Sequence, residues 1–190
     1  MKLIIASNNQ HKIREIKEIL GEKFEQILSL SESGIDHETV EDGESFLENA
    51  RKKAKEIAEI SGSCALADDS GICVDALGGA PGIFSARFAG EHGNDAANNA
   101  LLLKKLENEE NRGAHYTCAI VLAYPDGKTV EAEGYFYGSI TRNPRGERGF
   151  GYDPLFVPVG SDRTVAEYTD EEKNAISHRA EALRALLLKL

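Results

Sequence analysis

The chain has 190 residues, of which 41% are hydrophobic and 28% are charged. This length and composition suit a single globular domain, residues 1–190, with a sizeable core, and they exclude a disordered chain. The 22 basic and 32 acidic residues give a net charge of −10, which opposes non-specific binding to nucleic acid or to an anionic membrane. An anionic ligand must therefore be bound by a local cluster of basic groups.

The cysteines and the first residues bear on the cellular compartment. Cys64, Cys73 and Cys118 lie in apolar segments without a C-x-x-C pair, which indicates buried thiols in a reducing environment. The apolar run at residues 3–6 is too short for a signal peptide, and no later run is long enough to span a bilayer. We therefore expect a cytoplasmic protein that has neither a membrane nor a nucleic acid as its partner.

The chain begins with an apolar strand predicted at residues 3–6, a polar turn at 7–10 and an amphipathic helix that ends before Gly21. Lys12 falls in the first turn of this helix, where a cation is unfavourable unless an anion is also bound. Ser7, Asn9 and Lys12 are therefore candidates for binding phosphate. The alternative is an ordinary capped helix, because the turn lacks the glycines of a Walker loop.

A second strand is predicted at residues 24–30, and a long helix from a capping box at 45–48 to the region of Gly62. The polar loop before this helix contains Glu41, a candidate metal ligand because hard cations such as Mg²⁺ prefer carboxylate oxygens. Asn49 and Lys53 are four residues apart on the helix and share one face.

An acidic pair follows the next apolar segment. Residues 64–67 are small and apolar, as in a buried strand, and we expect Asp68 and Asp69 at the end of that strand. Burying adjacent carboxylates is costly unless a cation or hydrogen-bond donors compensate, which favours a metal site or a raised pKa. Because side chains alternate along a strand, only one of the two is expected to meet a substrate. The alternative is an acidic turn in which Asp69 or Ser70 caps a helix.

The C-terminal half combines a scaffold with a second group of candidate residues. A helix is predicted at residues 97–106, a hairpin at 116–123 and 129–137, and helices beginning near Thr169 and Ser177. Loop glycines flank Phe150, which gives either a flat face for stacking on a base or a turn with a core phenylalanine.

Basic residues gather near the starts of the last two helices. Lys173, His178 and Arg179 lie where positive charge helps a helix least, which argues for an anionic or polar ligand. The alternative is ordinary surface charge.

Together these motifs resemble the inosine triphosphate pyrophosphatase family, whose members hydrolyse non-canonical purine nucleoside triphosphates. The resemblance covers nearly the whole chain, and it is carried by residues 7–12, 41–50, 68–71, 74–87, 149–154 and 177–179. The pair Glu147-Arg148 before Gly149 departs from the small residues that are common in the family.

The resemblance implies an α/β fold with an elongated mixed sheet flanked by helices, and two lobes around a central substrate cleft. It also implies a homodimer, a Mg²⁺ cofactor, and cleavage of ITP, dITP or XTP between the α and β phosphates to give a nucleoside monophosphate and pyrophosphate.

The resemblance also assigns roles to particular residues. Glu41 and Asp69 are the implied metal ligands, and Asp69 and Lys53 are the implied catalytic residues, with Asp69 orienting or deprotonating the attacking water. The implied substrate-binding residues are Ser7, Asn9, Lys12, Ser70, Phe150, Gly151, Tyr152, Asp153, Lys173, His178 and Arg179.

Base selection follows from hydrogen-bond chemistry. Hypoxanthine and xanthine present an acceptor at O6 and a donor at N1, the reverse of adenine, so a pocket with matching partners would reject adenine. Lys173, His178 and Arg179 are the candidate donors, Asp153 the candidate acceptor and Phe150 the stacking platform. We expect both ribose and deoxyribose substrates to be accepted.

Two other functions remain open from the sequence. One is a Maf-like pyrophosphatase that acts on pyrimidine or modified nucleotides, and the other is a nucleotide sensor without turnover. The combination of Glu41, Lys53 and Asp69 argues against the sensor, because a pure binder gains nothing from a metal-bound carboxylate beside the α phosphate. A nucleic-acid-binding role is the weakest alternative, given the net charge of −10.

Overall fold

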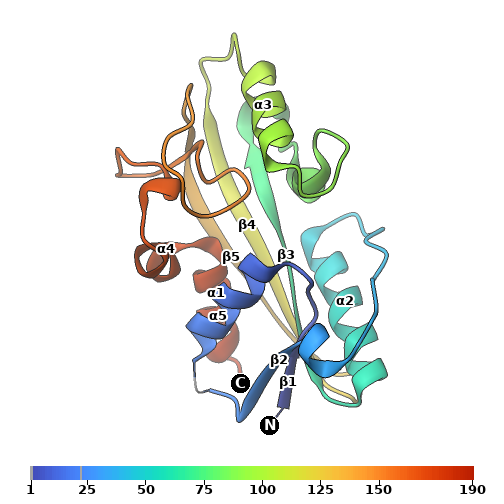
Figure 1. Cartoon of the computed structure of the whole chain (residues 1–190). Helices are drawn as coiled ribbons and strands as arrows, with labels where there is room; N and C mark the ends of the chain where they lie inside the picture. The colour runs from blue at the N-terminus through green and yellow to red at the C-terminus, as the bar shows by residue number, and fades with distance from the viewer. Residues whose placement is uncertain (1, 22) are drawn as a thin grey trace. The chain divides into compact units, whose positions relative to one another are not determined.

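The structure of the protein is a computed structural model that describes residues 2–21 and 23–190 (Figure 1). Its strands are β1 (Lys2–Ile5), β2 (Gln26–Ser29), β3 (Cys64–Val74), β4 (Gly113–Ala123), β5 (Thr129–Ile140) and β6 (Phe156–Pro158). Its α-helices are α1 (Gln10–Leu20), α2 (Phe46–Ser61), α3 (Asp95–Lys105), α4 (Asp170–Ile176) and α5 (His178–Leu187). Short 3-10 helices occur at Ser31–Ser33, Asp75–Leu77, Gly82–Arg87 and Val165–Glu167.

The strands form a mixed sheet. In the described residues the sheet has six strands in the order β2-β1-β3-β4-β5-β6. β1 pairs in parallel with β2 and β3, whereas β5 pairs antiparallel with β6. The predicted α/β class with a mixed sheet and helices is confirmed. Within the same residues, no helix is both long and apolar enough to cross a membrane.

The chain forms two compact units. Unit 1 comprises the chain up to Asp69 together with Cys118–Gly134 and His178–Leu190, and unit 2 comprises Ser70–Thr117 and Tyr135–Ser177. β3, β4 and β5 each contribute residues to both units. The single domain expected over residues 1–190 stays a prediction.

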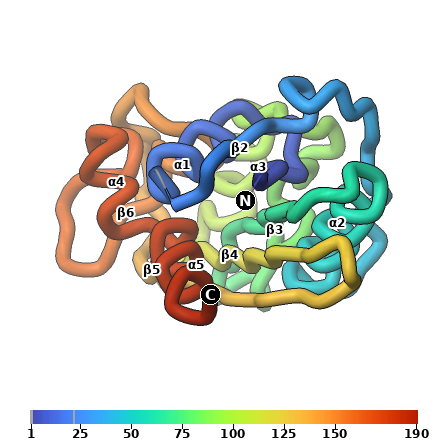
Figure 2. The backbone as a smooth tube through the Cα atoms, turned by 90° about the horizontal axis from the view of Figure 1, so that it is seen from below, coloured from blue at the N-terminus to red at the C-terminus, as the bar shows by residue number. Residues whose placement is uncertain are grey.

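Unit 1 is built by strands whose alternate side chains enter two different cores. Leu3 and Leu66 pack in one core with side chains of α1 and α5, whereas Ile4 and Ala65 pack in the other core with side chains of α2. α1 and α5 lie side by side in this unit (Figure 2). This arrangement fixes the starts of α1 and α5 beside the middle of β3.

Local sequence signals set the ends of the first two long helices. Asn9 caps α1 and Ser45 caps α2, while Gly21 and Gly62 end the helices with φ values of 52° and 61°. Glycine adopts these positive φ values at little cost. The predicted capping box of α2 is only half formed, because the Glu48 carboxylate accepts a hydrogen bond from the Glu44 amide at 2.7 Å.

Unit 2 has a separate core. Ile72, Val74 and Tyr116 of β3 and β4 pack there with Leu102 of α3 and Phe156 of β6. The short strand β6 was not predicted from the sequence, because three residues carry too little periodicity.

One strand prediction was wrong in its extent. The acidic pair was expected at the end of a strand near residue 67, but β3 continues from Cys64 to Val74, so Asp68 and Asp69 lie inside it. A strand tolerates two adjacent carboxylates here because positively charged side chains face both of them.

Candidate active site

The two carboxylates in the middle of β3 face different groups of side chains, as strand alternation predicts. Asp68 is 1% exposed and Asp69 is 6% exposed, so both are buried. Asp68 contacts Lys12 and Arg179, whereas Asp69 contacts Lys53. The two neighbours in sequence therefore have different chemical environments.

Asp68 is held by two cations and a thiol. Its Oδ1 is 2.5 Å from Lys12 Nζ, and its Oδ2 accepts hydrogen bonds from Arg179 Nε at 2.8 Å and from Cys118 Sγ at 3.0 Å. Burial acts to raise the pKa of Asp68, but the charges of Arg179 and Lys12 outweigh it and hold this pKa well below its usual range. Asp68 is therefore an ionised counter-ion and not a proton acceptor near neutral pH.

Arg179 does not lie on the surface. Its side chain is 1% exposed, and its guanidinium is shared between Asp68 and Glu15 of α1. The surface-charge alternative is therefore wrong for Arg179, which pairs with two carboxylates of unit 1. Sequence reasoning missed Glu15, although an acidic residue beside the apolar positions of α1 was a usable signal.

Lys53 links the two predicted metal ligands. Its Nζ lies 2.7 Å from Glu41 Oε1 and 3.2 Å from Asp69 Oδ1, and it donates to the carbonyl oxygen of Asp68 at 2.9 Å. Asn49 Nδ2 donates to Asp69 Oδ2 at 3.2 Å, so both residues of the predicted helix face reach Asp69. The structure thus brings Glu41, which the sequence could not connect to β3, to the same ammonium group as Asp69.

Burial and the charges of Lys53, Asp69 and Glu41 shift the pKa values of Asp69 and Lys53. Burial raises the pKa of Asp69, and the positive charges of Lys53 and Lys12 only partly oppose the effect. Burial alone would lower the pKa of Lys53, but Asp69 and Glu41 raise it more, so Lys53 is an ammonium ion. One cation faces two carboxylates, and hard oxygen donors with excess negative charge suit a divalent ion such as Mg²⁺. In the described residues no cluster of three or more metal-ligating side chains of the His, Cys, Asp or Glu type is present.

The turn before α1 is a helix cap in this structure. Asn9 Oδ1 accepts hydrogen bonds from the amides of His11 at 3.0 Å and Lys12 at 3.2 Å, and Ser7 Oγ accepts one from the Asn9 amide at 3.1 Å. The alternative of an ordinary capped helix therefore describes the local structure. Phosphate binding by Ser7, Asn9 and Lys12 stays a prediction, as it does for Ser70, which lies half-buried in β3.

The predicted base site in unit 2 is organised by Asp153. This side chain is buried, and it accepts hydrogen bonds from the Phe150 amide at 3.0 Å, Lys173 Nζ at 2.8 Å and Tyr116 OH at 3.3 Å. Lys173 Nζ also lies 4.5 Å from the centre of the Phe150 ring. The surface-charge alternative is wrong for Lys173 because the residue is only 5% exposed. Both carboxylate oxygens of Asp153 serve the protein itself, which limits its expected role as an acceptor for the base.

The remaining predicted site residues are also placed. Tyr152 is buried, and its hydroxyl donates to the carbonyl oxygen of Ser85 at 2.7 Å. Burial raises the pKa of Tyr152 and, together with Asp153, that of Tyr116, so both phenols stay protonated as donors. His178 is buried at the start of α5 in unit 1.

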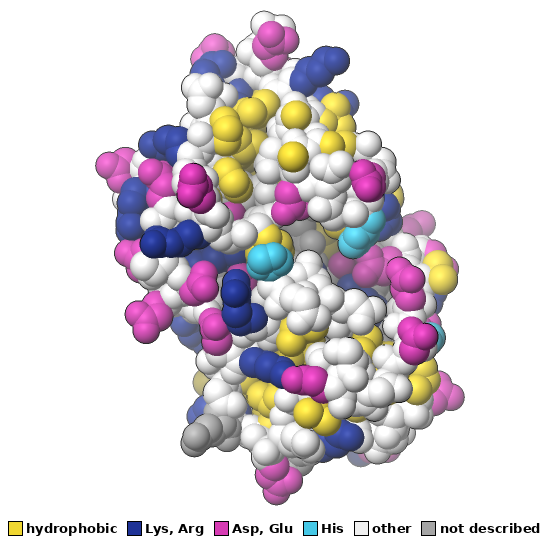
Figure 3. All heavy atoms as spheres, in the orientation of Figure 1, with side chains coloured by type: hydrophobic (Ala, Val, Ile, Leu, Met, Phe, Trp, Pro, Cys, Tyr) yellow, Lys and Arg dark blue, Asp and Glu magenta, His cyan; other side chains and the backbone are white. Residues whose placement is uncertain are grey.

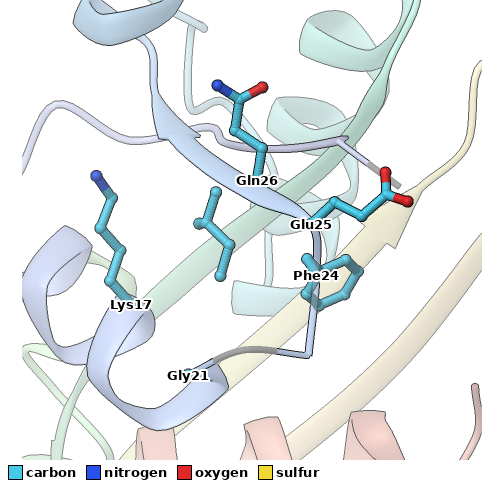
Figure 4. A pocket seen from close by; sticks show the side chains of 6 residues that line it. Lys17, Gly21, Phe24, Glu25 and Gln26 are labelled. Carbon is cyan, nitrogen blue, oxygen red and sulfur yellow. The ribbon is translucent and has the colours of Figure 1, made fainter.

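A hollow elsewhere in unit 1 contains none of the predicted site residues. It measures about 580 Å³ and is lined by Lys17, Gly21, Phe24, Glu25, Gln26 and Ile27 (Figure 4). It lies at the C-terminal end of α1 and the beginning of β2, whereas Lys12 is in the first turn of that helix.

Acidic and basic side chains are interspersed on the molecular face in Figure 3, in line with local cation clusters instead of one basic surface.

Comparisons with known proteins place this arrangement in a family. The profile of the Ham1 family matches residues 3–189. A dITP/XTP pyrophosphatase of Clostridium perfringens is 51% identical over 97% of this chain and 95% of its own length. The structure of the Staphylococcus aureus Ham1 protein is 40% identical with a TM-score of 0.89, covering 100% of this chain and 97% of that one.

A further solved structure agrees with these matches. It is the Mycobacterium abscessus nucleoside-triphosphatase / dITP/XTP pyrophosphatase, which is 48% identical with a TM-score of 0.79 and covers 98% of this chain and 99% of that one. Fold, length and sequence therefore agree along the whole chain. The chain belongs to the Ham1 family.

Proposed function

We propose that this protein is a dITP/XTP pyrophosphatase, which hydrolyses ITP, dITP and XTP to the nucleoside monophosphate and pyrophosphate. The observation that carries the proposal is the full-length similarity to relatives with that name, of which the Clostridium perfringens protein is 51% identical. The buried group of Lys53, Asp69 and Glu41 supports it, because it supplies a carboxylate and a cation at one place. The activity removes non-canonical purine nucleotides from the nucleotide pool.

In this proposal one group of residues binds the triphosphate and performs the hydrolysis. Lys12 and Lys53 bind phosphate oxygens and stabilise negative charge on the pyrophosphate leaving group. Asp69 orients the attacking water and accepts its proton. Ser7, Asn9 and Ser70 add hydrogen-bond donors to the phosphates.

Mg²⁺ is the proposed cofactor, and Glu41 and Asp69 are its proposed ligands. The fit is supported by the Lys53 ammonium, which contacts both carboxylates and so marks a position that favours positive charge. When bound, the ion would neutralise charge on the phosphate oxygens as a Lewis acid. Substrate oxygens and water would complete its coordination.

The residues around Phe150 are the proposed base site. Phe150 gives the stacking surface, with Lys173 4.5 Å from its ring centre, and Gly151 and Tyr152 follow it as further proposed substrate-binding residues. Lys173, His178 and Arg179 are the proposed donors to O6, so adenine, which carries a donor there, is disfavoured. The lobes and central cleft implied by the family resemblance are part of the same proposal.

We also propose a cytoplasmic homodimer. Tyr135 and Tyr137 of β5 are 38% and 59% exposed, and their rings stack with centres 6.2 Å apart. His115 of β4 lies 5.5 Å from the Tyr137 ring centre, so the three rings form one exposed aromatic patch in unit 2. A second copy is the proposed partner. Light scattering of Tyr137→Lys is expected to show monomer where the parent shows dimer, and an unchanged mass would reject this patch.

The test of the activity is pyrophosphate release with Mg²⁺ from ITP, dITP, XTP, ATP, GTP and dTTP, with each nucleotide product identified. Pyrophosphate and monophosphate from the first three, with little product from the rest, is the expected result. Preference for dTTP would favour a Maf-like enzyme instead. Orthophosphate with diphosphate would mean cleavage of the other anhydride bond, and binding without turnover would indicate a sensor.

A further inference from the structure

The helix α3 binds both backbone groups of Gly151, the residue after Phe150. The Gly151 amide donates to Asp95 Oδ2 at 2.7 Å, and the Gly151 carbonyl oxygen accepts from Asn99 Nδ2 at 2.9 Å. Asp95 and Asn99 are four residues apart in α3, so they share one face of the helix. Two side chains of one rigid helix therefore hold one peptide segment of the loop.

The same loop is fixed on its other side by Asp153. The Asp153 carboxylate accepts from the Phe150 amide at 3.0 Å and from Lys173 Nζ at 2.8 Å. Phe150 thus lies between two anchors, Asp153 on one side and α3 on the other. Gly151 has a φ of 62°, a conformation that L side chains rarely adopt, so the chain turns sharply between the anchors.

The Asn99 side chain binds Gly151 through its Nδ2 but leaves its other polar atom without a partner among the described residues. Its Oδ1 is buried, and within the described residues no hydrogen-bond partner for this atom is present. A buried acceptor without a partner is unfavourable, and an apolar side chain of similar size would avoid it. The advantage of asparagine over leucine at this position is therefore the Nδ2 donor that binds Gly151.

We propose that Asp95 and Asn99 are positioning residues for the base site: they hold Gly151 so that the Phe150 ring is fixed before a purine binds. The inference rests on the proposed function, in which Phe150 stacks on the base. A loop that is already ordered in the free protein binds its ligand more tightly than a loop that becomes ordered only when the ligand binds. The contacts of Asp95 and Asn99 with Gly151 are therefore expected to affect binding of the base and not binding of the phosphates.

Four variants separate this role from a general loss of stability. Asn99→Ala removes the donor, Asp95→Ala removes the acceptor, and Asp95→Asn retains an acceptor oxygen and serves as the rescue variant. The matched control is Asn98→Ala on the same helix. Asn98 accepts from the Ala89 amide at 2.8 Å and donates to the Ala86 carbonyl oxygen at 3.2 Å, so its replacement removes two hydrogen bonds at a different loop, whereas Asn99→Ala and Asp95→Ala each remove one.

The readouts are the KM and kcat for ITP, and product inhibition by IMP and by pyrophosphate. For Asn99→Ala and Asp95→Ala we expect KM and the IMP inhibition constant to rise about tenfold, since each variant loses one hydrogen bond that orders the loop. We expect kcat and pyrophosphate inhibition to stay within about twofold, because the phosphate groups are bound elsewhere. Asp95→Asn is expected to recover most of the IMP affinity.

Amide hydrogen exchange at Gly151 gives a readout that does not need turnover. It is expected to be faster in Asp95→Ala and unchanged in Asn98→Ala, and equal exchange in the two variants would overturn the proposal. Equal weakening of IMP and pyrophosphate inhibition would also overturn it. If the parent enzyme releases no pyrophosphate from ITP, the proposed function fails and the base-site role fails with it. If the parent is active and Asn99→Ala leaves IMP inhibition unchanged, the positioning role alone is rejected.

Discussion

Arg179 gives the sharpest test of how unit 1 is stabilised. Its side chain is 1% exposed, and it contacts carboxylates whose side chains are 0% exposed in Asp68 and 9% in Glu15. Arg179→Met retains much of the side-chain volume but removes the charge that faces both carboxylates. We expect the folded state to lose stability because two buried acids then lose a counter-ion.

The size of the expected loss of stability follows from the burial of the ion pairs and from the charge of Lys12, which remains. Removing one partner of a buried ion pair costs roughly 3–5 kcal/mol. Lys12 Nζ stays 2.5 Å from Asp68 Oδ1 and compensates part of that charge, which places the expected loss near the lower limit, about 3 kcal/mol. The double variant Glu15→Gln/Arg179→Met no longer buries the second carboxylate, so it is expected to recover at least about 1 kcal/mol.

The assay is urea unfolding at neutral pH without nucleotide, so that any role of Arg179 in substrate binding does not enter. The control is Arg142→Met, which breaks an exposed pair with Glu110 at 3.3 Å and is expected to change stability by less than about 0.5 kcal/mol. A loss in Arg179→Met no larger than in this control would refute the argument. So would a Glu15→Gln change that lowers the stability of Arg179→Met further.

Three further predictions concern single residues. Asp69→Asn is expected to slow pyrophosphate release from ITP by at least about 100-fold while IMP still inhibits, and parental turnover would remove Asp69 from catalysis. Gly149→Ala should raise the KM for ITP and lower the melting temperature. Gly149 has a φ of 74°, and a Cβ there would meet the Asp153 carboxylate. An unchanged KM would contradict this prediction. Hydrogen bonds from the Lys17 ammonium and from the backbone amide and hydroxyl of Ser29 lower the pKa of Glu32 to about 2. The stability difference between the parent and Glu32→Gln should therefore be full above about pH 5 and shrink as the pH falls towards 2, and urea unfolding at several pH values would show whether it does.

Sequence reasoning succeeded where the signal is local. The start of α4 was predicted near Thr169, and both hydrogen bonds of a capping box between Thr169 and Glu172 are present there. The end of α1 at Gly21 and the shared face of Asn49 and Lys53 depend on neighbours within one or two helical turns. Such signals can be read from a single chain because the contacts are short in sequence.

It failed where the stabilising partner is distant in sequence. The end of β3 was placed too early because Asp68 looks incompatible with a strand interior, and the compensating charges come from residues 12 and 179. Asp95 and Asn99 were missed for the same reason. Their partner Gly151 lies more than fifty positions away, and α3 by itself reads as an ordinary capped helix.

The adjacent carboxylates of β3 show how one local pattern yields two chemical roles. Strand alternation turns Asp68 and Asp69 to different surroundings, and the cations there differ in number and in distance. Lys12 and Arg179 lower the pKa of Asp68, while burial raises that of Asp69, with Lys53 compensating only in part. Opposite shifts in neighbouring acids separate a fixed counter-ion from a proton acceptor. On this basis Asp68 supports the position of Lys12 and Arg179, and Asp69 is the carboxylate of the pair that we propose as the acceptor of the proton from the attacking water.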